Sequence, residues 1–186
     1  SGSKAKGAKE LLKELKGLGA KVTLKACDVS DPEQLKALLG KLPKAHPLGA
    51  IFHAAGVLDD ATVEKLSPEQ LGRVFKAKAD SALALHELTK DQELSAFVLF
   101  SSAAGALGAP GQANYAAANS FLDALAQQRR AEGLPATSIA WGMWERESSM
   151  TSGLSDLDKA RMERAGVLAL TDEQGLGLFD QALGHA

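Results

Sequence analysis

Cysteine is almost absent from this sequence of 186 residues, which contains only Cys27. A lone cysteine can form neither an internal disulfide nor a zinc site, so we predict a reducing, cytoplasmic environment. His46, His86 and His185 share no spacing typical of metal ligands, and we therefore predict no metal site. His53 is interpreted as a structural residue.

Long apolar runs and an excess of charge are also missing. No stretch approaches the ~20 apolar residues of a membrane-spanning helix, so we expect no membrane insertion. Residues 1–16 are basic and helical in pattern but lack the apolar centre of a secretory leader. The formal net charge of -2 favours neither nucleic acid nor an anionic membrane as a partner. We predict one domain over residues 1–186.

Apolar runs alternate with helical patterns along the chain, which predicts an α/β fold with a parallel sheet. Asp31 before Pro32 and Ser67 before Pro68 are typical helix N-caps. Ligands of such sheets bind beyond the carboxyl ends of the strands, so polar residues that close a strand are site candidates. Strands are predicted at residues 21–29, 48–56, 94–105 and 135–144, and helices at residues 10–20, 30–42, 67–90, 111–133, 155–166 and 171–183.

The only tyrosine, Tyr115, lies 13 residues after Ser102, which closes a predicted strand. Asn119 follows four residues later and therefore shares one helix face with Tyr115. A phenol with an ordinary pKa of ~10 donates its proton poorly at neutral pH unless a cation stabilises the phenolate. Lys78, on the preceding long helix, is the candidate cation.

The segments around these residues resemble the ketoreductase domain of modular polyketide synthases, a relative of the short-chain dehydrogenases. Residues 75–89 match the lysine segment of that family at Lys78, and residues 97–144 match its catalytic segment nearly throughout. Most short-chain dehydrogenases carry the lysine four residues after the tyrosine, where this chain has Asn119. Ketoreductases exchange the two residues, as this chain does. The resemblance covers roughly residues 8 to 184.

The resemblance implies a Rossmann-like, doubly wound parallel sheet with helices on both faces. It also implies that NADPH reduces the β-ketone of a thioester carried on an acyl carrier protein. Tyr115 would protonate the developing alkoxide, and Ser102 would donate a hydrogen bond to the same oxygen. Lys78 would stabilise the phenolate and hold a ribose hydroxyl, and Asn119 would position Lys78 or a water molecule.

Other matches imply cofactor contacts after the predicted strands. The matching residues are Asp28 at the adenine, Ala54, Ala55 and Gly56 along the ribose, and Gly142 and Met143 beside the nicotinamide. Asp28 also has a plain interpretation as a turn aspartate, and residues 53–56 as tight helix–sheet packing.

Stereocontrol has a separate signature in this family. Leu58, Asp59 and Asp60 match the Leu-Asp-Asp element of B-type ketoreductases, which predicts an R-configured (D) β-hydroxyl. A-type members carry tryptophan where this chain has Leu107, and Gln112 is a further candidate for contact with the substrate. A solvated acidic loop is the alternative interpretation of the two aspartates.

Residues 145–170 resemble the mobile lid over the substrate, under which Met150 would face the substrate channel. A plain connecting loop with a surface helix is the alternative for this segment. Trp144 could line the entrance or belong to the edge of the core.

Part of the family pattern is not found. The family opens with a strand, a glycine-rich turn that cradles the pyrophosphate, a helix and a second strand. These elements, a final strand and the family's structural subdomain have no match here. We favour a fragment of a longer polypeptide; a second chain that supplies the strands, or a rearranged sheet, stays open. We expect little activity from the isolated chain.

Three other functions fit parts of this sequence pattern. The chain could be a non-catalytic structural or docking fragment, although all four catalytic residue types are present. It could be the β-ketoacyl reductase of an animal-type fatty acid synthase, which shares the catalytic pattern, although the Leu-Asp-Asp element favours a polyketide synthase. A free-standing sugar or steroid dehydrogenase fits less well, because of the exchanged lysine and asparagine.

Overall fold

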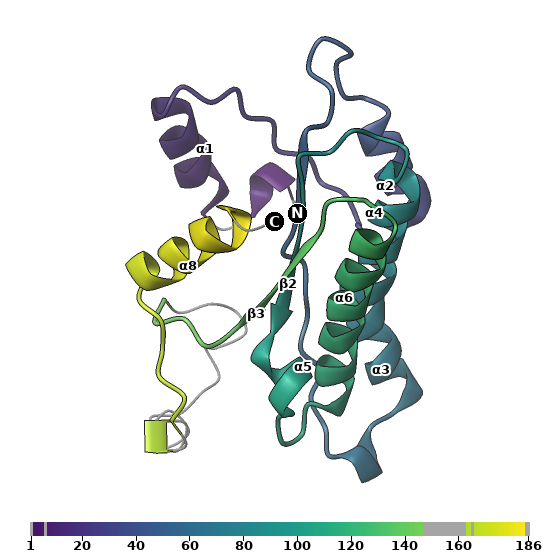
Figure 1. Cartoon of the computed structure of the whole chain (residues 1–186), viewed down its shortest axis with the longest axis vertical. Helices are drawn as coiled ribbons and strands as arrows, with labels where there is room; N and C mark the ends of the chain where they lie inside the picture. Colours follow the sequence, from purple (N-terminus) through teal and green to yellow (C-terminus); the bar gives the residue numbers. More distant parts are fainter. Residues whose placement is uncertain (1, 6, 147–162, 165, 185–186) are drawn as a thin grey trace.

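The structure, a computed structural model, describes residues 2–5, 7–146, 163–164 and 166–184. Its centre is a parallel sheet of three strands in the order β1-β2-β3, made of β1 (Ala50–His53), β2 (Ala96–Ser102) and β3 (Thr137–Trp141). Helices lie on both sides of this sheet (Figure 1). The predicted α/β fold with a parallel sheet is confirmed.

The register brings the carboxyl ends of the strands to one edge. His53 pairs with Leu99 of β2, and Ser102 pairs with Trp141 of β3. Ligands of parallel sheets bind at this edge. The residues that follow each strand therefore begin close to one another, although they are far apart in the sequence.

One helical layer packs on the sheet through a continuous apolar core. α2 (Pro32–Leu39), α4 (Ser81–Thr89) and α6 (Ala113–Ala131) supply its helical side. Leu122 of α6 and Leu99 of β2 are fully buried in it. Replacing such a leucine by alanine typically costs about 2–5 kcal/mol, so this layer holds the strand ends in place.

The long helix predicted over residues 67–90 has three parts. α3 (Pro68–Phe75) leads into a π-helical turn, η3 (Lys76–Asp80), which leads into α4. Ser67 and Gln70 form a capping box at the start of α3, and the Asp31 carboxylate accepts hydrogen bonds from two backbone N–H groups at the start of α2. Both predicted N-caps are therefore confirmed.

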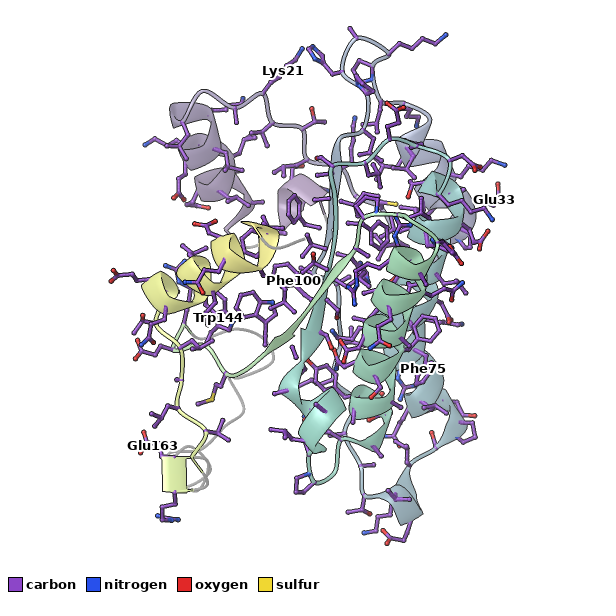
Figure 2. The ribbon with its side chains drawn as sticks, in the orientation of Figure 1. Lys21, Glu33, Phe75, Phe100, Trp144 and Glu163 are labelled. Carbon is purple, nitrogen blue, oxygen red and sulfur yellow. The ribbon has the colours of Figure 1, made fainter. Side chains whose placement is uncertain are left out.

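α8 (Asp172–Gly184) lies on the opposite side of the sheet, as does α1 (Ala8–Gly17) (Figure 1). The Phe179 ring of α8 is 5.8 Å from that of Phe52 and 6.1 Å from that of Phe100. A Cβ atom on Gly175 would lie 2.2 Å from the Trp144 ring, so only glycine permits this approach. Figure 2 shows Trp144 beside α8. The contact with Trp144 explains the glycine at position 175.

The remaining short elements connect the larger ones. They are η1 (Gly2–Lys4), η2 (Val63–Lys65) and α5 (Ala103–Leu107). α5 follows β2 directly, where the sequence had predicted only the end of a strand. No helix among the described residues is long and apolar enough to span a membrane.

One predicted strand is wrong. Residues 21–29 form no strand, because a strand needs a hydrogen-bonded neighbour and none of the described residues pairs with this segment. Asp28 consequently does not close a strand. The interpretation of residues 48–56 as a buried strand holds only in part, since Phe52 is 51% exposed. The helix predicted over residues 155–166 falls almost entirely outside the described residues.

Candidate active site

The π-helical turn η3 places Lys78 against the end of β2. The Lys78 side chain is buried, and its Nζ donates hydrogen bonds to the Phe100 carbonyl at 2.7 Å and to Asn119 Oδ1 at 2.9 Å. π-turns are rare and frequently occur at functional sites. The two acceptors fix the ammonium between the sheet and α6.

Asn119 joins Lys78 to Tyr115. The Asn119 side chain is fully buried, and its Nδ2 donates to the Tyr115 carbonyl at 2.8 Å. Ser101 Oγ donates to the Asn119 carbonyl at 3.2 Å. The Lys78 ammonium lies 5.3 Å from the centre of the Tyr115 ring, within cation–π range. The structure thus brings together three of the four predicted catalytic residues.

Ser102, the fourth, caps the short helix α5. Its Oγ accepts a hydrogen bond from the Ala104 N–H at 3.2 Å, which leaves the hydroxyl hydrogen for an acceptor elsewhere. α5 in turn packs on α6, where Ser120 Oγ donates to the Gly105 carbonyl at 2.9 Å. This contact fixes Ser102 relative to the helix that carries Tyr115.

Gly105 makes that packing possible. A Cβ atom on Gly105 would lie 3.1 Å from both Asn119 Cβ and Ser120 N. Gly105→Ala should push α5 away from α6 and misplace Ser102, lowering kcat of a complete domain about tenfold. Steady-state kinetics would check this, with Gly72→Ala in α3 as the control, because a Cβ there meets nothing within 4 Å. An equal effect of both substitutions would contradict the packing argument.

Burial also changes the acidity of the site. It lowers the pKa of Lys78 to about 8, and the charge of Asp123 offsets part of this shift. Lys78 therefore titrates just above neutral pH, whereas an ordinary lysine, with a pKa of ~10.4, stays protonated there.

This shift predicts a pH dependence of stability. Between pH 8 and 10.5 the unfolded chain binds the Lys78 proton more strongly than the folded chain does, so stability should rise with pH through that window. Relative to Lys78→Met, the wild type should gain roughly 2 kcal/mol in free energy of unfolding between pH 7 and pH 10. Urea unfolding of both proteins across pH would measure the difference. Parallel pH curves for the two proteins would contradict the lowered pKa.

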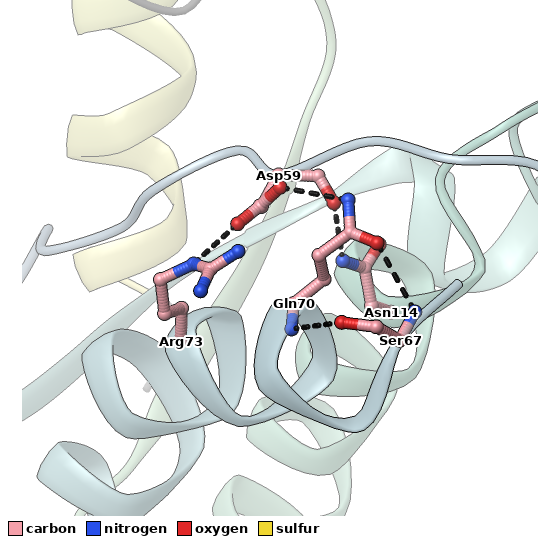
Figure 3. Close-up of polar contacts among 5 residues, drawn as sticks. All are labelled: Asp59, Ser67, Gln70, Arg73 and Asn114. Atoms are coloured by element: carbon pink, nitrogen blue, oxygen red, sulfur yellow. Dashed lines mark hydrogen bonds and ion pairs between the residues drawn. The ribbon is translucent and has the colours of Figure 1, made fainter. Parts of the chain in front are cut away.

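Asp59 ties its loop to α3 and α6 (Figure 3). Its carboxylate accepts hydrogen bonds from Arg73 Nε at 2.5 Å and from Gln70 Nε2 at 2.9 Å. These bonds hold the pKa of the Asp59 carboxyl below its ordinary value. The Asp59 carbonyl accepts from Asn114 Nδ2 at 2.8 Å, and Asn114 Oδ1 accepts from the Tyr115 N–H at 2.8 Å.

A second contact joins the same loop to the start of α6. Gln112 Nε2 donates to Asp60 Oδ2 at 2.8 Å, and the Ala61 N–H donates to the Gly111 carbonyl at 2.9 Å. The Leu-Asp-Asp loop is therefore bonded to the residues that precede Tyr115. The alternative of a merely solvated acidic loop does not describe Asp59. Its side chain accepts hydrogen bonds from Arg73 and Gln70, and its backbone carbonyl accepts one from Asn114 of α6.

The candidate cofactor residues lie mostly at the shared strand edge. Ala54 to Gly56 follow β1, and Gly142 and Met143 follow β3. Ala54 and Gly142 are exposed, and a Cβ atom on Gly142 would meet nothing within 4 Å. Asp28 is different: its exposed carboxylate accepts hydrogen bonds from the Ser30 N–H at 3.0 Å and the Ser30 hydroxyl at 2.7 Å, in the turn before α2.

Leu107 and the lid complete the list of candidates. Leu107 ends α5 and is 81% exposed, whereas Met150 lies outside the described residues. The two ends of the expected lid, residues 145–170, are held together: the Glu145 N–H donates to the Leu170 carbonyl at 2.9 Å.

Sequence reasoning missed the residues that support the site. Arg73, Gln70 and Asn114 were not proposed, because their contacts with Asp59 join segments 11 to 55 residues apart. The position of Asn114 directly before the only tyrosine was the one available signal. Among the described residues no cluster of three or more acidic, histidine or cysteine side chains could hold a metal ion.

Comparison with known proteins identifies the family. A family model described as the KR domain matches residues 1–146. This chain belongs to the KR domain family. Polyketide synthase GfsB of Streptomyces halstedii is 56% identical to this KR domain over 183 residues, and mycoketide-CoA synthase of Mycobacterium tuberculosis is 53% identical over 182 residues. Each match covers 98% of this chain but only 3% and 4% of those relatives.

Solved ketoreductases share the fold of this KR domain. An A-type ketoreductase from a modular polyketide synthase has a TM-score of 0.91 and 51% identity, covering 98% of this chain and 38% of that one. The first ketoreductase of the tylosin polyketide synthase has a TM-score of 0.83 and 44% identity, covering 99% of this chain and 39% of that one. The Rossmann-like fold implied by the resemblance is confirmed, and the chain spans well under half of these solved ketoreductases.

Proposed function

We propose that this KR domain uses NADPH to reduce the β-keto group of a polyketide thioester carried on an acyl carrier protein. The observation that carries the proposal is the buried contact chain from Lys78 through Asn119 to Tyr115, at the carboxyl edge of a parallel sheet. Membership of the KR domain family and the similarity to polyketide synthases support the reaction and the carrier-bound substrate.

The described residues fit the ribose and nicotinamide half of NADPH. Ala54, Ala55 and Gly56 follow β1 with small side chains, and the open space beside Gly142 follows β3, so a flat ligand can approach the backbone at both places. Lys78 between them offers a cation. When bound, NADPH supplies the hydride. The glycine-rich pyrophosphate turn of the family has no counterpart among the residues that the structure describes.

Tyr115 acts as the general acid toward the oxygen of the ketone. Its phenol proton moves to that oxygen as negative charge develops there, and Ser102 donates a second hydrogen bond to the same atom. Lys78 stabilises the phenolate that remains, through a charge held 5.3 Å from the ring centre. Asn119 keeps that charge in place, because its side chain is bonded both to Lys78 and to the Tyr115 backbone.

The product is an R-configured (D) β-hydroxyl under this proposal. The Leu58-Asp59-Asp60 element supports the B-type assignment, and its bonds to the start of α6 couple it to the helix that carries Tyr115. Two A-type ketoreductases with solved structures are 51% and 50% identical to this chain, although the motif favours the B type. The configuration of the β-hydroxyl product is therefore the most informative single measurement. An S-configured product would overturn the B-type assignment without affecting the reductase proposal.

Further strands of the synthase complete the sheet beside β1. In the described residues β1 is an edge strand with a free side, and Phe52 on it is 51% exposed. Exposed edges and apolar side chains of this kind are normally covered. We therefore propose that the pyrophosphate cradle comes from neighbouring sequence and that the isolated chain has little activity.

Two measurements test these statements separately. Titration of the isolated chain with NADPH, followed by nicotinamide fluorescence, should show no saturable binding at micromolar concentration. A complete domain that contains this sequence should reduce a β-ketoacyl thioester on a carrier protein and consume NADPH. Turnover by the isolated chain would refute the requirement for further strands. A complete domain without reductase activity would favour the non-catalytic docking role, and a preference for short fatty acyl chains would favour a fatty acid synthase.

A further inference from the structure

The backbone of the π-helical turn η3 (Lys76–Asp80) is held by side chains that the proposed reaction does not use. His53, the last residue of β1, is buried with 3% exposure, and its Nε2 lies 3.1 Å from the Lys78 carbonyl oxygen and 3.1 Å from Ser81 Oγ. Ser81 is fully buried and donates to the Ala77 carbonyl at 2.8 Å. Buried polar groups are normally hydrogen-bonded, and these contacts are the partners of His53 Nε2.

The hydrogen positions follow from these contacts. The Ser81 hydroxyl has one hydrogen to donate. Its shortest contact is with the Ala77 carbonyl, so we place the hydrogen in that bond. His53 Nε2 must then carry a hydrogen, because the Lys78 carbonyl can only accept. Burial lowers the pKa of His53, which keeps the ring neutral. The neutral ring therefore donates to Lys78 from the carboxyl end of β1.

We propose that His53 is a positioning residue that holds η3 in the shape which directs the Lys78 ammonium at Asn119. Lys78 is clamped at both ends: β1 holds its carbonyl through His53, while Phe100 of β2 and Asn119 of α6 hold its Nζ. Among the described residues, only the side chains of His53 and of Lys78 itself form hydrogen bonds that join the π-turn to the sheet. His53 touches neither reacting group, so it acts through Lys78.

Amine labelling of the isolated chain tests the positioning without any activity. Lys78 is buried and should react slowly with an acylating reagent, whereas exposed Lys76, two residues away on the same turn, should react quickly. His53→Met keeps the side-chain volume but removes the donor, and should speed labelling of Lys78 about tenfold, the factor expected for one buried hydrogen bond. His53→Gln keeps a donor and should restore slow labelling. Peptide mass spectrometry reads both lysines, and Lys76 is the internal control.

The outcomes are distinct. Unchanged labelling of Lys78 in His53→Met would overturn the proposal, as would equal acceleration at Lys76 and Lys78, which would indicate general loosening. If His53→Met does not fold, His53→Leu takes its place, because it also removes the donor to the Lys78 carbonyl. Slow labelling of Lys78 in that variant would then overturn the proposal.

The catalytic consequence rests on the proposed function and needs a complete domain. His53→Met should lower kcat about tenfold in the wild type but less than about twofold in a Lys78→Met background, because residues that act through one another are not additive. Equal losses in both backgrounds would show that His53 does not act through Lys78. A wild-type domain without reductase activity would instead refute the proposed function, while the labelling result would stand.

Discussion

Replacing Tyr115 by phenylalanine is expected to lower kcat of the complete ketoreductase domain by about 10²–10⁴-fold, the usual contribution of a positioned general acid. The hydrogen bonds that the structure gives Tyr115 use its backbone N–H and carbonyl, and phenylalanine preserves both. The ring also stays beside the Lys78 ammonium. The substitution should therefore remove the proton donor and leave the fold intact.

The rate of NADPH oxidation with a carrier-bound β-ketothioester would measure this loss, together with the melting temperature of each protein. Thr89→Val is a matched control, because it removes a buried hydroxyl at the far end of α4, bonded to the Leu85 carbonyl at 2.6 Å. It should lower stability and leave kcat unchanged. Retention of wild-type turnover by Tyr115→Phe would mean that another group supplies the proton.

The second large effect concerns stability. Arg129 of α6 is 1% exposed, and its guanidinium lies 3.9 Å from the centre of the Phe97 ring. Arg129 Nη1 lies 2.8 Å from His86 Nδ1, and Arg129 Nε donates to the Pro135 carbonyl at 3.2 Å. Burial lowers the pKa of Arg129, but the guanidinium stays charged at neutral pH. This side chain links α4, β2 and the turn before β3.

Arg129→Ala should destabilise the fold by about 3–5 kcal/mol, because it opens a cavity and leaves a buried imidazole nitrogen and a carbonyl without a donor. Arg130→Ala is the neighbouring control: Arg130 is exposed and makes one bond, to the Ala136 carbonyl at 2.9 Å. Its removal should cost less than about 1 kcal/mol. Urea unfolding would measure both variants, and similar midpoints for the two would contradict the structural role of Arg129.

Local signals in the sequence predicted much of this molecule. The N-caps at Asp31 and Ser67 depend on neighbouring residues only, and both are confirmed. The spacing of Ser102, Tyr115 and Asn119 is likewise local, so their placement on a strand end and one helix face follows from helix and strand geometry. Their catalytic roles stay predictions.

Non-local features could not be predicted in the same way. Residues 21–29 have the composition of a strand, but composition cannot show that a partner strand is missing beside it. The π-turn at Lys76–Asp80 inserts one residue into a helical pattern that an ordinary α-helix fits equally well. Arg73 and Asn114 meet Asp59 only after folding.

The contacts that assemble the site have a consequence for engineering synthases. The interval from the start of β1 to the end of β3 contains Lys78, whose hydrogen bonds span up to 41 residues, together with its neighbours His53, Phe100, Tyr115 and Asn119. A chimeric synthase that joins two parents inside this interval would mix the partners of Lys78 from different origins. Exchange boundaries placed before Gly49 and after Trp144 would transfer the whole set as one cassette. If a chimera with a junction inside this interval loses activity, substitutions that restore the contacts of Lys78 should be sought in the same interval first.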